Sequence, residues 1–187
     1  MSKNIVFYVL VIACFSCTND YTLVNSDKIK CIDYEIHTLF LDENNRRLNG
    51  FYRIFRSGNG FGGVWQSELI EGLFLDGKLD GTIKIYNKNP NYKQKVNKWG
   101  LPKAEKTPED LVKQYSKIHK IINFKDGILD GECIIYSEEL EPKAIANYER
   151  GVLDDITYDG KVKDVESSKK ITELFKIKLN NSKLNNN

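Results

Sequence analysis

F-L-D-G-K-L-D-G-T-I-K-I-Y, residues Phe74 to Tyr86, returns later in the chain as F-K-D-G-I-L-D-G-E-C-I-I-Y, residues Phe124 to Tyr136. Both copies contain a leading phenylalanine, an Asp-Gly pair, a Leu-Asp-Gly triplet and a closing tyrosine. Two further passages, Arg46 to Phe55 and Tyr148 to Tyr158, follow the same order of residue types more loosely. The pattern therefore indicates a protein built from repeats.

Each copy of the repeat predicts a β-hairpin. Asp76-Gly77 and Asp126-Gly127 are flanked by apolar and aromatic residues. An Asp-Gly pair supplies the positive φ values that a tight type I′ turn requires, so we expect the chain to reverse at both pairs. After the first turn, residues 82–86 alternate between polar and apolar side chains, as in a strand with one buried face.

A second glycine follows each turn, Gly81 in the first copy and Gly131 in the second. A glycine inside a strand indicates a bulge or a close backbone approach. Because a single hairpin is marginally stable in water, each unit must bury its apolar face on its neighbours. We therefore predict a mainly β fold, an elongated antiparallel sheet of successive hairpins over residues 31–163, with an insertion at about residues 87–111.

The unit resembles the bacterial variant of the MORN (membrane occupation and recognition nexus) repeat, in which an aromatic-x-Asn/Asp-Gly-Lys-Leu-x-Gly motif precedes an alternating strand that ends in tyrosine. Arg47 stands where the turn glycine would be in the first unit, and Asp155 replaces the second glycine in the last. The resemblance implies a sheet of hairpins, often exported or membrane-anchored and sometimes antitoxin-like, and it brings no catalytic residue. It rests on Phe74, Asp76, Gly77, Lys78, Leu79, Gly81 and Tyr86, and on Phe124, Asp126, Gly127, Leu129, Gly131 and Tyr136.

The N-terminus reads as an export signal. Lys3 precedes an apolar run, Ile5 to Ala13, which is too short to span a bilayer but matches the hydrophobic region of a signal peptide. Cys14 follows Val-Ile-Ala and fits the motif of a lipoprotein signal peptidase, and Cys17 follows a serine and fits it as well. We favour Cys17, which leaves residues 1–16 as the signal peptide, because this choice gives a longer apolar region and a polar mature start.

Lipidation would place the protein on a membrane outside the cytoplasm. Two or more acyl chains, palmitate among them, suffice for stable anchoring. Residues 17–30 would then form a polar tether. The sequence predicts an exported, membrane-anchored protein of the bacterial cell envelope or surface; a buried N-terminal strand or an uncleaved anchor is the alternative.

Cys31 and Cys133 are the remaining cysteines. Two thiols of an exported protein can form a disulfide. However, stacked hairpins need not bring cysteines of the first and third units within the roughly 5.5 to 6 Å between Cα atoms that a bridge requires. Cys133 also occupies a strand position that suits a small buried apolar residue. The sequence leaves both possibilities open.

The insertion between the two clear repeats is basic and aromatic. Thr107-Pro108 predicts a helix start, and a helical face made of Leu111, Val112, Tyr115 and Ile118 is expected to pack on the sheet. A long interruption of a regular array is a candidate binding site. The candidate partner-binding residues are Tyr92, Lys95, Lys98 and Trp99; alternatively the loop is only solvated and its tryptophan packs against the sheet.

The C-terminal part, residues 164–180, contains an amphipathic pattern from Glu166 to Leu179. We predict a helix that caps the open end of the sheet and protects its edge strand, with a membrane-surface helix as the alternative. Residues 181–187 form a polar tail that we expect to be disordered.

The composition offers no sign of catalysis. The two histidines, His37 and His119, lack the spacing of metal ligands, and a formal net charge of +2 does not indicate nucleic-acid binding. We predict no catalytic residue, metal or cofactor. The expected function is a membrane-anchored lipoprotein that acts as a non-catalytic binding or scaffold module for a protein or cell-envelope component. The alternative is an antitoxin- or immunity-like protein that neutralises a toxin.

Overall fold

The structure is a computed structural model that describes residues 21–60, 63–89, 98–99, 112–162, 173–177 and 179. These residues form one large β-sheet, a separate two-stranded hairpin, and two short 3₁₀ turns, η1 (Ser26–Lys28) and η2 (Glu173–Phe175). The prediction of a mainly β fold is confirmed. The signal peptide, 1–16, and the tail, 181–187, lie outside the described residues.

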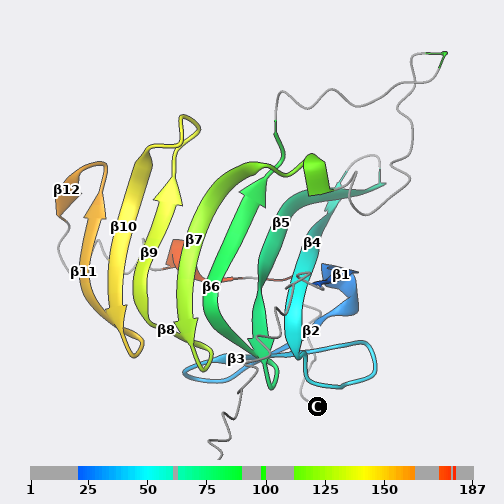
Figure 1. Cartoon of the computed structure of the whole chain (residues 1–187), viewed down its shortest axis with the longest axis horizontal. Helices are drawn as coiled ribbons and strands as arrows, with labels where there is room; N and C mark the ends of the chain where they lie inside the picture. Colours follow the sequence, from blue (N-terminus) through cyan, green and yellow to red (C-terminus); the bar gives the residue numbers. More distant parts are fainter. Residues whose placement is uncertain are drawn as a thin grey trace, which may run out of the picture.

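The main sheet places nine strands in the order β1-β4-β5-β6-β7-β9-β10-β11-β12, and β8 pairs with β7 (Figure 1). All neighbours from β4 onward are antiparallel, whereas β1 runs parallel to β4, so the sheet is mixed at this edge. The strand bounds are β1 (Tyr21–Asn25), β4 (Gly50–Gly60), β5 (Gly63–Leu75), β6 (Lys78–Asn87), β7 (Lys117–Lys125), β8 (Ile128–Leu129), β9 (Gly131–Tyr136), β10 (Pro142–Glu149), β11 (Val152–Tyr158) and β12 (Lys161–Val162).

The predicted turns are present. Asp76-Gly77 joins β5 to β6 with φ values of 50° and 77°, and Asp126-Gly127 joins β7 to β8 with 53° and 82°. Two positive φ values in succession are those of a type I′ turn. Arg150-Gly151 and Asp159-Gly160 have the same pair of positive φ values, so two further hairpins use this turn.

The predicted bulges are also present. Between β5 and β6 the register changes from Glu71 opposite Lys84 to Leu73 opposite Asp80, and Gly81 lies in the shifted stretch with a φ of 70°. Gly131, with a φ of 95°, is the corresponding glycine of the second repeat and the first residue of β9. A residue with a side chain rarely adopts such a φ, which explains why the repeat has a second glycine at this position.

The segment predicted to be a polar tether contains secondary structure. From Tyr21 onward the predicted tether, 17–30, is ordered: β1 pairs with β4, and η1 leads into β2 (Lys30–Asp33). β2 and β3 (Thr38–Leu41) pair with each other and form a hairpin apart from the main sheet. Because β1 supplies an edge partner for β4, this segment belongs to the folded domain.

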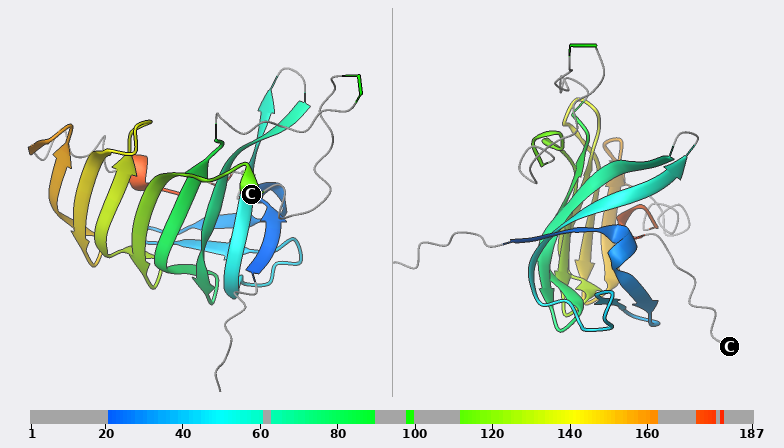
Figure 2. Two further views of the ribbon diagram at one scale, coloured as in Figure 1. Left: turned by 45° about the horizontal axis from the view of Figure 1, so that its top comes forward. Right: turned by 90° about the vertical axis from the view of Figure 1, so that its right-hand side faces the viewer.

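One face of the sheet, which we call the inner face, carries the main core. The β2–β3 hairpin and η2 lie on the concave side of the curved sheet (Figure 2). Because successive side chains of a strand point to opposite faces, every second side chain points inward, and the hairpin and η2 cover these side chains. The buried core comprises Ile29, Phe40, Leu48, Ile54, Ile70, Phe74, Leu79, Ile83, Ile85, Ile122, Cys133, Ile135, Ala144, Ala146, Tyr148, Ile156, Phe175 and Leu179.

The predicted C-terminal helix is wrong for the described part of this segment. Residues 173–175 form a single 3₁₀ turn, and neither Lys176 nor Ile177 is helical. The Phe175 ring is fully buried and meets the Tyr148 ring edge to face at 6.3 Å. Since η2 lies against the inner face, this segment covers the core and does not cap the end of the sheet.

A smaller apolar cluster lies on the opposite, outer face. Phe55, Leu69 and Tyr115 are buried there, with Val112 packed against them. The predicted packing on the sheet is thus confirmed for Val112 and Tyr115, but the predicted helical face is wrong for Tyr115, which is not helical. It is wrong for Ile118, which pairs with Tyr86 in the sheet, because backbone pairing with β6 resumes at Lys117. The insertion from 90 to 97 and from 100 to 111 lies outside the described residues.

Candidate functional site

The turns of successive repeats are hydrogen-bonded to one another. In each case the backbone N–H of the turn glycine donates to the carbonyl oxygen of a leucine in the preceding unit, over 2.8 Å. The three pairs are Gly77 with Leu48, Gly127 with Leu79, and Gly151 with Leu129. These bonds form a ladder along one edge of the structure, and we call them the turn ladder.

A side-chain hydrogen bond also joins each pair of successive units. Asp126 donates its backbone N–H to the Oδ1 atom of Asp80 at 3.1 Å, and Arg150 does the same to Asp130 at 2.9 Å. In the first step Asp76 donates to Asn49 at 2.7 Å. The predicted repeat-turn residues Asp76, Gly77, Gly81, Asp126, Gly127 and Gly131 are therefore structural elements that join or shape hairpins.

Two of the four candidate partner-binding residues belong to the described part of the chain. Trp99 is 75% exposed, and the Lys98 Nζ atom lies 5.1 Å from the centre of its ring. A cation within about 6 Å of the centre of an aromatic ring is attracted to the face of that ring. The tryptophan does not pack against the sheet, contrary to the alternative considered from the sequence. Tyr92 and Lys95 lie outside the described residues.

The cysteines of the folded domain are not bridged. Cys31 and Cys133 are both free thiols. Cys133 is fully buried, as its strand position predicted. Burial, and then the charge of Asp33, raises the pKa of the Cys31 thiol to about 12. Neither thiol is therefore suited to act as a nucleophile at neutral pH. The candidate lipidation sites, Cys17 and Cys14, lie outside the described residues.

The two histidines have different surroundings. The ring of His37 stacks on Tyr34 with 5.0 Å between centroids. His119 lies on β7, where burial and then the charge of Lys120 lower its pKa. Among the described residues there is no group of three histidine, cysteine or carboxylate side chains that could hold a metal ion.

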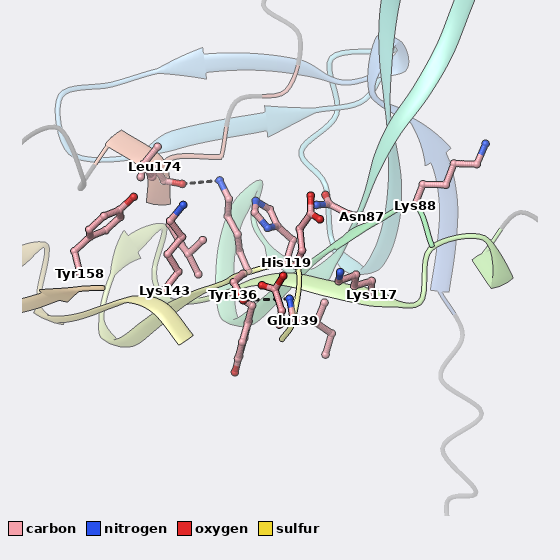
Figure 3. A pocket seen from close by; sticks show the side chains of 14 residues that line it. Asn87, Lys88, Lys117, His119, Tyr136, Glu139, Lys143, Tyr158 and Leu174 are labelled. Atoms are coloured by element: carbon pink, nitrogen blue, oxygen red, sulfur yellow. Dashed lines mark hydrogen bonds between the residues drawn. The ribbon is translucent and has the colours of Figure 1, made fainter. Parts of the chain in front are cut away.

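One cleft of the described structure contains a cluster of basic side chains that the sequence did not indicate. Its volume is about 640 Å³, within the range of small-molecule sites. It lies where the ends of β6, β7, β9, β10 and β11 meet η2 (Figure 3). We call it the lysine cleft; it is lined by Asn87, Lys88, Lys117, Ile118, His119, Lys120, Ile135, Tyr136, Ser137, Glu138, Glu139, Lys143, Tyr158 and Leu174.

Two lysines occupy the η2 end of the lysine cleft. The ammonium of Lys120 donates a hydrogen bond to the carbonyl oxygen of Leu174 at 2.7 Å. The Nζ atom of Lys143 lies 5.7 Å from the centre of the Tyr158 ring. Figure 3 shows Lys143 and Tyr158 close to Leu174, whereas Lys88 points away from them. This end of the cleft therefore combines positive charge with an aromatic wall.

The other end of the cleft has a different character. Lys117 and Glu139 lie together there, away from Leu174 (Figure 3). The pKa of Glu139 is lowered, first by its hydrogen bond with Ser137 and to a lesser extent by the charge of Lys117. The cleft is thus cationic at the η2 end and mixed in charge at the other.

A second cleft, of about 460 Å³, lies between the β2–β3 hairpin, the sheet and the C-terminal segment. Its charged lining mixes Asp33, Glu35 and Glu173 with Lys176. These groups do not converge on one sign of charge. The lysine cleft is therefore the stronger candidate for a ligand site.

The lysine cleft was missed because its residues come from five strands and a turn that are distant in sequence. Lys117 and Lys120 are visible in K-I-H-K of β7, but Lys143 lies on β10 and Leu174 in η2. Only the sheet order brings β7, β9 and β10 side by side. No local motif of the sequence marks the site.

Comparison of the chain with protein-family models, curated proteins and solved structures gave no match. In the described part of the chain, none of the helices has the length and apolar character needed to cross a bilayer.

Proposed function

We propose that the protein is an exported bacterial lipoprotein, anchored in a membrane through acylated Cys17 or Cys14, that serves as a non-catalytic binding or scaffold module of the cell envelope. The observation that carries this proposal is the order of Lys3, the apolar run and the two cysteines at the N-terminus. Lipid attachment gives stable anchoring when several acyl chains are present.

The position of β1 supports close attachment to a membrane. Only residues 18–20 separate Cys17 from Tyr21, the first residue of β1. An extended chain covers at most about 3.3 to 3.6 Å per residue, so a lipid on Cys17 would hold the start of β1 within roughly 15 Å of the acylated sulfur. β1 begins on the side of the sheet away from η2 (Figure 2), so the outer face would lie toward the membrane.

The turn ladder supports the finer proposal of a MORN-like array. Each hairpin contributes the same glycine N–H to the same leucine carbonyl of its neighbour, which is the nearest-neighbour stacking expected of a repeat protein. The exact repetition of these bonds at Gly77, Gly127 and Gly151 gives the array a rigid surface. A rigid surface suits a scaffold, because little conformational entropy is lost when it binds.

The use of the repeat carboxylates also favours a binding module over an enzyme. Asp80 and Asp130 recur in the clear repeats, and each accepts a backbone N–H group of the next hairpin. They therefore act as structural acceptors. This structural role explains why the two aspartates recur, and no catalytic pair of a general acid and a general base is needed to explain them.

The exposed Trp99 beside Lys98 is the observation that favours the second candidate function, an antitoxin- or immunity-like protein. Exposed tryptophans are frequent anchors of protein interfaces. In this function the insertion would contact a partner toxin, and stable co-purification of a toxin that is lost in Trp99→Ala would support it.

Metabolic labelling with a palmitate analogue tests the anchor. The wild type should be labelled and found in the membrane fraction, and Cys17→Ser should lose both properties. Loss in Cys14→Ser instead would support the same function with the other cysteine. Cys31→Ser is the matched control, because its thiol lies in the folded domain and should not affect labelling. An unlabelled wild type with an intact N-terminus would contradict the proposal.

A further inference from the structure

The η2 end of the lysine cleft holds two cations without a carboxylate partner. Within the described residues, neither Lys120 nor Lys143 takes part in a salt bridge. Lys120 donates to a carbonyl, which is a neutral acceptor, and Lys143 lies over a tyrosine ring. An ammonium has three donors, so each lysine retains capacity to bind an anion.

Burial strengthens the case for an anion at this position. Desolvation lowers the pKa of the Lys120 ammonium, and the charge of Arg56 lowers it further, while Glu68 raises it. A cation that has lost part of its hydration gains more from an opposite charge than an exposed one does, because the local dielectric is lower. Binding of an anion would raise the pKa of Lys120 toward its ordinary value.

The chemistry of the lining favours a phosphate group. The ammonium group of a lysine is a compact point charge that binds phosphate. The lining contains four lysines and no arginine. A phosphate monoester carries between one and two negative charges at neutral pH, which two adjacent lysines can meet.

The other residues of the lining restrict the charge and size of the part of the ligand beyond its phosphate group. Tyr158, Ile135 and Leu174 provide an apolar wall beside the two lysines. Glu138 and Glu139 lie along the cleft and would repel a second anionic group. A volume of about 640 Å³ accommodates a body the size of a sugar.

We propose that the lysine cleft binds a small organic phosphate with a neutral body, such as a sugar phosphate, with Lys120 and Lys143 holding the phosphate group. The ligand would identify what the binding module recognises. The proposal therefore rests on the protein being a binding module, and it does not require the lipid anchor.

Calorimetric titration of the detergent-solubilised full chain with glucose 6-phosphate tests this site. We expect saturable binding, at least tenfold weaker in Lys120→Gln and in Lys143→Gln, and no binding of glucose. Lys125→Gln is the matched control, because Lys125 lies on the same strand β7 and is exposed outside the cleft. It should bind with unchanged affinity.

Lys143→Gln keeps the test decisive if loss of the Lys120 bond to Leu174 disturbs folding. Absence of saturable binding, or equal weakening in Lys125→Gln, would overturn the proposal. Binding to vesicles containing phosphatidylglycerol but not to glucose 6-phosphate would also overturn it, since the phosphate would then come from a lipid surface. The double variant Cys14→Ser/Cys17→Ser should retain ligand binding, which separates this site from the anchor.

Discussion

At the scale of single residues, Asp130 joins two repeats through one side-chain hydrogen bond. Its Oδ1 atom accepts the backbone N–H of Arg150 at 2.9 Å. A hydrogen bond of this kind contributes about 1 kcal/mol to stability. We expect Asp130→Ala to lower the free energy of unfolding by roughly that amount, measured by urea denaturation, and Asp130→Asn to lower it less. Asn49 shows that an amide oxygen can accept the same bond.

The chain offers a matched control for this prediction. Leu153-Asp154 repeats the Leu-Asp pair of the earlier units, but the structure gives no hydrogen bond to the Asp154 side chain among the described residues. Asp154→Ala should therefore change stability by no more than about 0.5 kcal/mol. Equal losses in Asp130→Ala and Asp154→Ala would show that the turn ladder does not depend on this acceptor.

The same residues show what local sequence can and cannot predict. The turn at Asp76-Gly77 was predictable, because the conformation of an Asp-Gly pair depends on those two residues. The role of Asp80 was not, because its partner, the N–H of Asp126, belongs to the next hairpin and is separated from it by the insertion. Proximity of this kind exists only after the hairpins have stacked.

Cys31 makes stability depend on pH in alkaline solution. Burial raises its folded-state pKa to about 12, well above the ordinary value of 9.0 for a cysteine thiol. Above pH 9 the unfolded chain releases this proton while the folded chain keeps it, so the contribution to stability is present below about pH 9 and is lost as the pH rises toward 12. Cys31→Ala should therefore flatten the decline in stability between pH 9 and 11.

Urea denaturation at several pH values measures this effect. A second variant, Cys133→Ala, should also flatten the alkaline decline, because burial raises the pKa of that thiol as well. A pH profile of Cys31→Ala that is parallel to that of the wild type would contradict the assignment of a buried, protonated thiol.

At the scale of elements, the C-terminal segment is part of the core. Phe175 is fully buried against Tyr148, whereas its neighbour Leu174 is 44% exposed. Removal of a buried phenylalanine side chain costs about 3 to 5 kcal/mol, and removal of a half-exposed leucine costs much less. We expect Phe175→Ala to reduce the midpoint of urea denaturation strongly and Leu174→Ala to reduce it slightly.

Similar behaviour of the two variants would mean that η2 does not pack on the inner face. Truncation of the chain before Glu173 gives a second readout, since it removes both Phe175 and Leu179 from the core. The truncated protein should be at least as unstable as Phe175→Ala. A truncated chain of wild-type stability would contradict the packing.

The errors in predicting the elements have a common physical source. The apolar spacing of Leu174, Phe175 and Leu179 fits a helix, but a 3₁₀ turn followed by irregular chain buries Phe175 and Leu179 equally well. Ile118 fitted the face of a preceding helix, yet its backbone pairs with β6. β1 was expected to be a tether because its sequence is short and partly polar. In each case tertiary contacts decided between two local structures.

At the scale of the whole molecule, the sequence predicted the order of hairpins but not how their faces are covered. The prediction of a mainly β sheet rested on repeated turns, which are local features. The β2–β3 hairpin and the C-terminal segment come from opposite ends of the chain and meet on the same inner face (Figure 2). The lysine cleft combines strand residues with Leu174 of η2, so no single segment of the sequence could reveal it.

The proposed anchor and the proposed cleft describe one arrangement of the molecule. A lipid on Cys17 would hold the start of β1 and the outer face near the membrane. The lysine cleft touches η2, which lies on the inner side of the sheet (Figures 2 and 3). The ligand site would therefore open away from the lipid surface and toward soluble molecules of the cell envelope.

Mass spectrometry of the N-terminal peptide, from protein isolated from bacterial membranes, tests the central proposal most directly. The proposal predicts a mature chain that begins at Cys17, or at Cys14, and carries the added mass of a diacylglyceryl group. A chain that begins at Met1 with unmodified Cys14 and Cys17 would contradict the lipoprotein assignment.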